Sequence, residues 1–436
     1  MNAANSTFLI ISSVLVFFMT PGLAFFYGGL VSKKNVVNTM LSVFFICGIA
    51  VVLYAAVGYE LSFNGDIGGI IGQVKHFFLS GVDLAALQSK ELGINVGTYL
   101  IFQMMFAIIT PALFVGAIVG RMRFNFLLLF IVFWSILVYY PMVHIVWSAK
   151  GMLASYGVLD FAGGTVVHIN AGITALVLSV FLGKRIDFNK KREHYNMPWV
   201  LLGTTILWIG WYGFNAGSAL GMNEVAVQAF LTTTVATAAA LVIWMVLDML
   251  IVGKPTLEGV CTGTICGLVG ITPAAGFVTA AGAFWIGACS TLVSFCFITY
   301  IKAKLKYDDP LDAFGCHGVS GIVGSILTGG AFATKAANSS LTQNGLFYGG
   351  GWHQLLVQLV GTLFTIVFVT VVVCIIVVAM KLFVKIRVDE KEELVGLDQG
   401  EHGEFADYTV APKLTDIEKY GEEFQGQLAH LNNPKS

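Results

Sequence analysis

Charge is scarce in this sequence. Asp, Glu, Lys and Arg make up only 11% of its 436 residues, whereas 57% are hydrophobic and the mean hydropathy is +0.81. So little polar surface cannot cover a soluble globule of this size, and the composition therefore predicts an integral membrane protein. The formal net charge of −1 gives no indication of nucleic-acid binding.

The sequence also lacks the short patterns that carry familiar chemistry. It has no HExxH, GxSxG or P-loop motif, which argues against an enzyme. Its seven cysteines form no CxxC pair and no metal-like spacing, so we interpret them as buried small hydrophobes. No basic residue precedes Lys33, so the first apolar stretch is predicted to be a retained span and not a cleaved signal peptide.

What the sequence has instead is a series of long apolar segments. They run at residues 8–30, 36–60, 97–120, 124–147, 162–183, 197–217, 226–252, 257–276, 278–301, 314–333 and 354–380. Segments of this length cross a bilayer as helices, so the sequence predicts an all-α integral membrane protein with about eleven transmembrane helices.

The basic residues give an independent indication of topology, because Lys and Arg collect on the cytoplasmic side of a membrane protein. One set of alternate loops holds Lys33, Lys34, Arg121, Arg123, Lys184, Arg185, Lys190, Lys191, Arg192, Lys254, Lys302, Lys304 and Lys306. The other set holds only Lys75, Lys90, Lys150 and Lys335. This asymmetry predicts an N-terminus outside and a C-terminus in the cytosol.

The spans divide into two groups. Five precede Lys184 and five follow Arg192, so the second group would be inverted relative to the first, with one extra helix at the end. From about Val388 the composition turns charged and polar. We therefore expect a membrane domain at residues 1–387 and a cytosolic tail of uncertain order at 388–436.

Two histidines lie deep inside apolar stretches, and each has the same neighbours at the same spacing. The two sets are Asp160, His168, Gly172 and Asp309, His317, Gly321. An ionisable side chain at membrane depth is costly and usually marks a substrate or proton path. The duplication therefore predicts two half-sites that meet in one pore, with the imidazoles paired through a shared ring hydrogen bond.

Other interpretations of these residues stay open. The histidines could merely satisfy each other or a backbone carbonyl, or they could ligate a haem or a metal ion. Glycines at 315, 318, 321 and 324 argue for close helix packing over space for a haem. Asp160 and Asp309 lie near helix starts, where a carboxylate caps free amides. Alternatively, Asp160 supports cation binding. We expect Asp312, like Asp160 and Asp309, to be either structural or cation-supporting.

Aromatic residues near the predicted outer ends form a second constellation: Phe102, Phe106, Trp147 and Phe214, with the hydroxyl of Ser218 nearby in the sequence. Each alone is typical of a core or interfacial position. Their common depth predicts a gate, at which Trp147 offers a π-face to an entering cation and Ser218 offers an acceptor.

Several stretches resemble the signature sequences of the ammonium transporter family (Amt/Mep/Rh), most closely its Amt branch. They are DFAGGTVVH at 160–168, GKPT at 253–256, DDPLDAFGCHG at 308–318, PGLAFFYGG at 21–29, FQMMF at 102–106 and GFNAGS at 213–218. The resemblance covers essentially the whole membrane part.

This resemblance implies a plasma-membrane homotrimer whose subunits each have their own pore and need no cofactor. It also implies that ammonium or methylammonium is recruited at Phe106, Trp147 and Ser218, with Phe102 beside them. Phe106 and Phe214 would form the gate. The ion would lose its proton above His168 and His317. The stretch GLDQGEHGEFADY at 396–408 resembles the family's regulatory tail, which in many members meets a PII-type signalling protein. Here Asp407 is an extra residue before the tyrosine. An ammonium sensor that signals through this tail is the alternative within the same resemblance.

Two Asn-x-Ser/Thr triplets, at Asn5 and Asn338, are predicted to lie outside. They are candidate glycosylation sites that would matter only in a secretory host.

Overall fold

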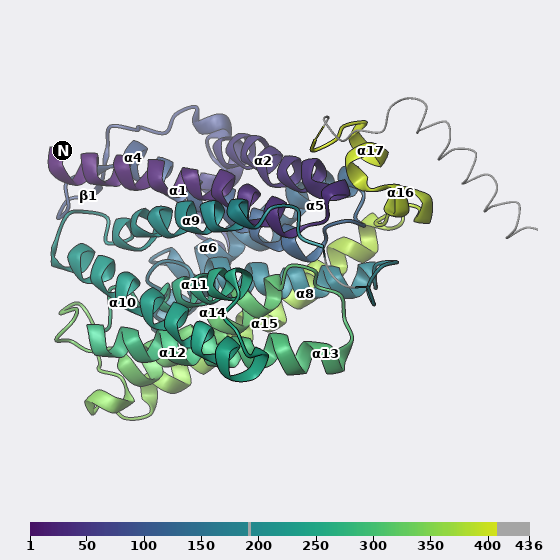
Figure 1. Cartoon of the computed structure of the whole chain (residues 1–436). Coiled ribbons are helices and arrows are strands. Elements are labelled where there is room, and N and C mark those ends of the chain that lie inside the picture. The colour runs from purple at the N-terminus through teal and green to yellow at the C-terminus, as the bar shows by residue number, and fades with distance from the viewer. Residues whose placement is uncertain (191–192, 408–436) are drawn as a thin grey trace, which may run out of the picture.

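A computed structural model describes residues 1–190 and 193–407, and this part of the chain is almost entirely helical (Figure 1). The long helices run side by side. The N-terminus lies at one end of the bundle, and the last two short helices lie at the opposite end.

The first half contains the following elements, where η denotes a 3-10 or π-helical turn. They are α1 (Ala3–Leu30), η1 (Lys33–Asn35), α2 (Val36–Leu53), η2 (Tyr54–Gly58), α3 (Tyr59–Phe63), η3 (Phe77–Leu79), β1 (Leu87–Ser89), β2 (Ile94–Asn95), α4 (Val96–Leu113), η4 (Phe114–Ala117), α5 (Phe124–Trp134), η5 (Ser135–Tyr139), α6 (Tyr140–Trp147), α7 (Met152–Tyr156), η6 (Gly164–Ile169) and α8 (Asn170–Leu182). The two strands form a small antiparallel pair in the loop before α4.

The second half and the tail follow. They contain α9 (Met197–Gly217), α10 (Glu224–Leu247), η7 (Asp248–Val252), α11 (Leu257–Ile271), α12 (Ala280–Cys296), η8 (Phe297–Ile301), α13 (Lys302–Leu305), η9 (Phe314–Val319), α14 (Ser320–Leu327), η10 (Thr328–Phe332), η11 (Leu346–Tyr348), α15 (His353–Met380), α16 (Glu390–Val395) and α17 (Leu397–His402). Many starts follow from the sequence, because a polar side chain such as Asn95, Asn196 or Thr256 accepts a hydrogen bond from a first-turn amide.

Within residues 1–190 and 193–407, eight continuous helical segments are long and apolar enough to cross a membrane. The three other expected spans are also helical, as α9, α11 and the run from η9 to η10, but they fall outside this set. Helix α11 has only 15 residues, and the other two are rich in glycine and polar residues. The chain is therefore a multi-pass α-helical membrane protein, whereas the count of eleven and the orientation in the bilayer stay predictions.

The two helices that carry the duplicated histidines pack against each other. Residues of α8 contact η9, and residues of α14 contact η6, so each histidine-bearing turn lies on the other helix. Both turns are π-helical and both lead directly into an α-helix. This crossing places the candidate site at the junction of the two halves.

The described part of the tail, up to Asp407, packs on the membrane part. Backbone hydrogen bonds join Arg123 to Ile386 and Val388 to Arg121. Arg123 pairs with Asp389, Glu392 and Glu401, and α16 begins with a capping box formed by Asp389 and Glu392. The remainder of the predicted tail, residues 408–436, lies outside the described residues.

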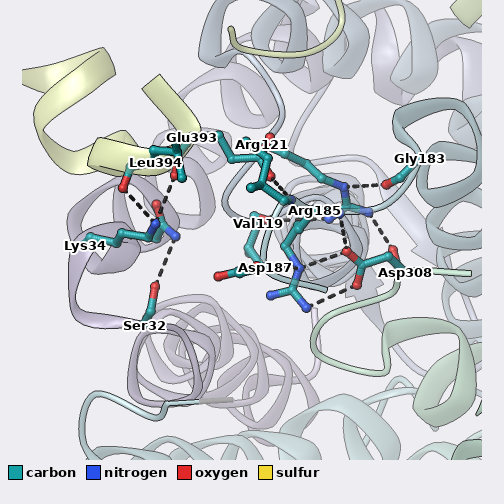
Figure 2. Close-up of polar contacts among 12 residues, drawn as sticks. Ser32, Lys34, Val119, Arg121, Gly183, Arg185, Asp187, Asp308, Glu393 and Leu394 are labelled. Carbon is teal, nitrogen blue, oxygen red and sulfur yellow. Dashed lines mark hydrogen bonds and ion pairs between the residues drawn. The ribbon is translucent and has the colours of Figure 1, made fainter. Parts of the chain in front are cut away.

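A network of basic residues connects this tail to the end of α8 and to the segment before η9 (Figure 2). The guanidinium of Arg121 is fully buried and donates to the carbonyl oxygens of Gly183 and Asp308. Arg185 donates to the Asp308 carboxylate at 2.9 Å, and Lys34 donates to the carbonyl oxygens of Glu393 and Leu394 (Figure 2). Burial lowers the pKa of Arg121 to about 10. The pKa of Asp308 lies below its usual value, because Arg121 and Arg185 together outweigh the burial that would raise it.

Candidate functional site

A continuous column of rings runs from the C-terminal end of α6 to the crossing of the two halves. Trp147 meets Phe106 edge-on with ring centroids 5.5 Å apart, and Phe106 meets Phe214 at 4.4 Å. Phe214 lies 5.8 Å from the ring of His168, which lies 5.4 Å from the ring of His317. The predicted outer aromatics and the predicted histidines thus belong to one connected structure.

Trp147 forms the upper end of this column. It is only partly buried, and its indole N–H donates to the carbonyl oxygen of Asp160 at 3.1 Å, which fixes the plane of the ring. Phe102 packs edge-on against Phe106 at 5.0 Å. The half-buried Ser218 donates its hydroxyl proton to the carbonyl oxygen of Phe214, so its oxygen lone pairs stay available to a cation.

Phe106 and Phe214 close the column in the middle. Their side chains are buried, with at most 1% of each residue exposed. The two rings are tilted by 40° to one another and form an apolar contact between Trp147 and His168 in the column.

The two histidines are nearly parallel, with an angle of 10° between their ring planes. Both are buried, and both ring nitrogens of His168 and the Nδ1 atom of His317 have no hydrogen-bond partner. The shared ring hydrogen bond that the sequence suggested is therefore not formed. The rings are held instead by packing, because His168 lies between His317, Phe214 and the indole of Trp211. Unpaired buried polar atoms are rare in native folds, so these nitrogens indicate a functional demand.

Trp211 is a site residue that the sequence analysis missed. Its indole lies nearly parallel to the ring of His168, 12° apart in angle and with centroids 5.2 Å apart. Its N–H donates to the hydroxyl of Thr272 at 2.8 Å, so the ring is anchored from behind. The available signal was its position on the same helix as Phe214, one turn earlier, since side chains three residues apart share a helix face.

A small cavity continues the column below His317. It is lined almost entirely by apolar side chains: Leu23, Phe26, Tyr27, Leu113, Leu207, Trp211, Ile265, Leu311, Ala313, Cys316 and His317. The hydroxyl of Tyr27 donates to the carbonyl oxygen of Leu113 at 2.7 Å. The cavity is therefore apolar.

The two aspartates of the duplicated sequence make matching contacts. Asp160 accepts from the amides of Gly163, Thr165 and Val166, all at 3.1 Å. Asp309 accepts from the amides of Ala313 and Phe314. Each carboxylate thus caps the turn that carries its histidine, the structural role considered from the sequence.

Asp312 lies in a different environment. Its carboxylate pairs with Lys302, whose ammonium also donates to the carbonyl oxygen of Asp309 at 2.5 Å. Lys302 thereby ties the start of α13 to the turn that precedes His317. We find no reason in these contacts to place Asp312 in the passage.

The two candidate glycosylation asparagines use their amides internally. Asn338 is buried and donates to the carbonyl oxygen of Gly276, and Asn5 donates to that of Leu92. Both amide nitrogens thus have an internal acceptor, and whether the two triplets lie outside stays a prediction.

Comparisons with known proteins agree with this architecture. The model of the Ammonium Transporter Family matches residues 7–407. The chain is 45% identical to an ammonium transporter of Aquifex aeolicus over 407 residues, which are 93% of this chain and 94% of the relative. Among solved structures, Saccharomyces cerevisiae Mep2 aligns with a TM-score of 0.82 at 32% identity, covering 89% of this chain and 91% of that one. A structure described as a sensor Amt protein aligns with a TM-score of 0.82 at 28% identity, covering 92% and 98%. The chain belongs to the Ammonium Transporter Family, whose named members here are transporters and not enzymes.

Proposed function

We propose that this transporter collects ammonium at an outer site formed by Phe106, Trp147 and Ser218, with Phe102 beside them. Ammonium gives up its proton at the gate of Phe106 and Phe214, and neutral ammonia passes His168 and His317. The observation that carries the proposal is the unbroken column of rings from the partly exposed Trp147 to the paired histidines.

Free energies favour the neutral species inside the column. Stripping water from an ammonium ion has an idealised cost of order 20 kcal/mol, and one cation–π contact returns only about 2 kcal/mol. Releasing the proton is far less costly: with the lysine amine as a proxy, a pKa of about 10 corresponds to around 4 kcal/mol at pH 7. Ammonia is therefore the species expected between the buried phenyl rings.

The histidines have two roles in this proposal. Their unpaired ring nitrogens offer hydrogen bonds to ammonia in a passage lined mostly by apolar side chains, and they provide the stations along which the released proton moves separately. A haem between the rings is disfavoured, because α8 and η9 pack backbone to backbone beside His317 and leave no room for a flat macrocycle.

The histidine roles are tested by current recording on liposomes that contain the full-length protein. His168→Ala and His317→Ala should each abolish the ammonium-evoked current or alter its selectivity. His353→Ala, at an exposed histidine on α15, is the matched control and should behave like the parent. Unchanged currents in both pore variants would refute the involvement of the histidines.

The outer site is tested by the concentration dependence of methylammonium uptake. Trp147→Leu removes the π-face and should raise the apparent KM about five- to tenfold, since a contact of about 1 to 1.4 kcal/mol is lost. Trp285→Leu, on the exposed side of α12, is the control. An unaltered concentration dependence in Trp147→Leu would count against the site.

A second candidate function is ammonium sensing, since one solved relative is described as a sensor. A pure sensor would bind ammonium without flux. Uptake into liposomes separates the two, because a sensor would show ligand-dependent change in the tail with no accumulation of methylammonium.

Further features expected from the family resemblance and from the charges of the loops are part of the proposal. We place the protein in the plasma membrane as a homotrimer with one pore in each subunit, with its N-terminus outside. We also propose that the cytosolic tail meets a PII-type protein. The described tail supports a regulatory contact in one respect, since its α16 and α17 helices lie on the basic face formed by Lys34 and Arg123.

A further inference from the structure

A fully buried histidine that the proposed mechanism does not use lies one turn before Trp147. His144 is on α6 with none of its side chain exposed. Its Nδ1 atom lies 2.9 Å from the carbonyl oxygen of Ser62 at the end of α3, and its Nε2 atom lies 3.0 Å from the carboxylate of Asp66 in the following outer loop. Both ring nitrogens therefore have partners on a different part of the chain.

Donor counting shows that this contact needs an extra proton. A carbonyl oxygen only accepts hydrogen bonds, so Nδ1 must carry a hydrogen. The bond between Nε2 and Asp66 then needs a second hydrogen, on the ring or on the carboxyl. Hydrogen bonds from His144 and from the Gly69 amide hold the pKa of Asp66 below its usual value. One hydrogen is therefore shared between Nε2 of His144 and the carboxyl group of Asp66.

The loop that contains Asp66 also holds the chain on the other side of Trp147. The Asp66 carboxylate accepts from the amide of Gly69, and the carbonyl oxygen of Gly69 accepts from the amide of Met152. Trp147 lies between these two attachments, at His144 and at Met152. Between them the chain turns tightly, because a Cβ on Gly151 would lie 2.1 Å from the carbonyl oxygen of His144.

We propose that His144 and Asp66 are positioning residues that hold the outer end of α6, and with it the indole of Trp147, in the orientation that receives the cation. This rests on the outer site of the proposed function. The pair does not touch the substrate. It acts by holding the loop at residues 64–73 against the segment that carries Trp147.

Other charged groups near the pair are few. Lys150, in the turn after Trp147, also lowers the pKa of Asp66. The carboxylate of Glu60 on α3 is already occupied by the side chain of Asn64 and the amides of Lys75 and His76. Asp66 is therefore the carboxylate that holds the ring of His144.

The test measures methylammonium uptake by the full-length protein in liposomes. Asp66→Ala should raise the apparent KM about five- to tenfold with little change in maximal rate, as Trp147→Leu does. Asp66→Asn should keep a KM near that of the parent, because its side-chain amide can donate a hydrogen bond to Nε2 of the ring. Asp83→Ala removes an exposed carboxylate from the same outer loop and is the control.

The double variant Asp66→Ala/Trp147→Leu distinguishes the possible outcomes. A KM equal to that of Trp147→Leu alone supports the proposal, whereas additive effects overturn it. A parental KM in Asp66→Ala, with a raised KM in Trp147→Leu, overturns this inference and leaves the outer site intact. A parental KM in Trp147→Leu overturns the outer site itself, and the positioning role with it.

Discussion

Gly172 of α8 lies so close to Gly318 of η9 that a Cβ atom on Gly172 would be 2.3 Å from the Cα atom of Gly318. The reciprocal contact is looser, since a Cβ on Gly321 would lie 3.3 Å from the Cβ atom of His168 and from the carbonyl oxygen of Gly164. Small residues allow membrane helices to approach backbone to backbone. These two contacts set the separation of the twin histidines.

We predict that Gly172→Ala disrupts the site. The added methyl group would meet backbone, which cannot move aside as a flexible side chain can, so the helices must separate at a cost of about 1–3 kcal/mol or more. Thermal unfolding in detergent should shift downward and methylammonium uptake should be lost. Gly48→Ala is the control, because a Cβ there has nothing within 4 Å. Parental uptake and stability in Gly172→Ala would contradict the packing argument.

The sequence predicted the parts of this site that repeat or that share a helix face. The spacing of Asp160, His168 and Gly172 matched that of Asp309, His317 and Gly321, and the two turns have matching caps and reciprocal contacts. Composition was sufficient to predict a helical membrane protein, because it depends on the sum of many residues.

The contacts that the sequence could not predict join residues that are distant in the chain. Asp66 and His144 are 78 positions apart, and Trp211 meets His168 from another span. The missing ring hydrogen bond between the histidines depends on the orientation of two side chains, which helical periodicity does not specify. Likewise, the triplet at Asn338 did not indicate that the side-chain amide of Asn338 donates to the carbonyl oxygen of Gly276.

Trp211 should be necessary for keeping the histidines dry. Trp211→Ala would leave a void beside His168 and beside the cavity below it, at a cost of about 3–5 kcal/mol. Water that enters this void would allow hydrated ions to pass, so the variant should conduct ions other than ammonium. Trp211→Phe keeps a flat ring against His168 and should retain selectivity. Current recordings with sodium or potassium as the only cation measure this. If Trp211→Ala carries no sodium or potassium current, the ring of Trp211 only fills space.

Asp308 should give the protein an acid-sensitive component of stability. Since its pKa is lowered in the folded state, the carboxylate stabilises the fold above the unfolded pKa of about 3.9, and this stabilisation is lost as the pH falls through the lower folded value. Asp308→Asn leaves the buried side of Arg185 unpaired and should cost about 3 kcal/mol at pH 7.

Thermal unfolding in detergent at pH 7, 5, 4 and 3 tests this dependence. The difference between the parent and Asp308→Asn should be largest at pH 7 and should shrink below pH 4. Asp83→Asn, at an exposed carboxylate, should follow the parent at each pH. A difference that stays constant over the whole range would show that the Asp308 charge does not contribute to stability.

Truncation after Val388 should separate regulation from transport. It removes the acidic partners of Arg123 and the carbonyl oxygens of Glu393 and Leu394 that Lys34 contacts, but it leaves every residue of the ring column in place. Exposed and half-exposed ion pairs contribute only about 0–1 kcal/mol each, so the shortened protein should still fold. We expect flux in liposomes to be retained and the response to nitrogen status in cells to be lost.

Arg123→Gln, which breaks the tail contacts without removing the tail, should give the same loss of control if docking of the tail is what matters. Unaltered control in both variants would exclude the tail from regulation, whereas loss of flux in the truncated protein would mean that docking of α16 and α17 supports the pore helices themselves.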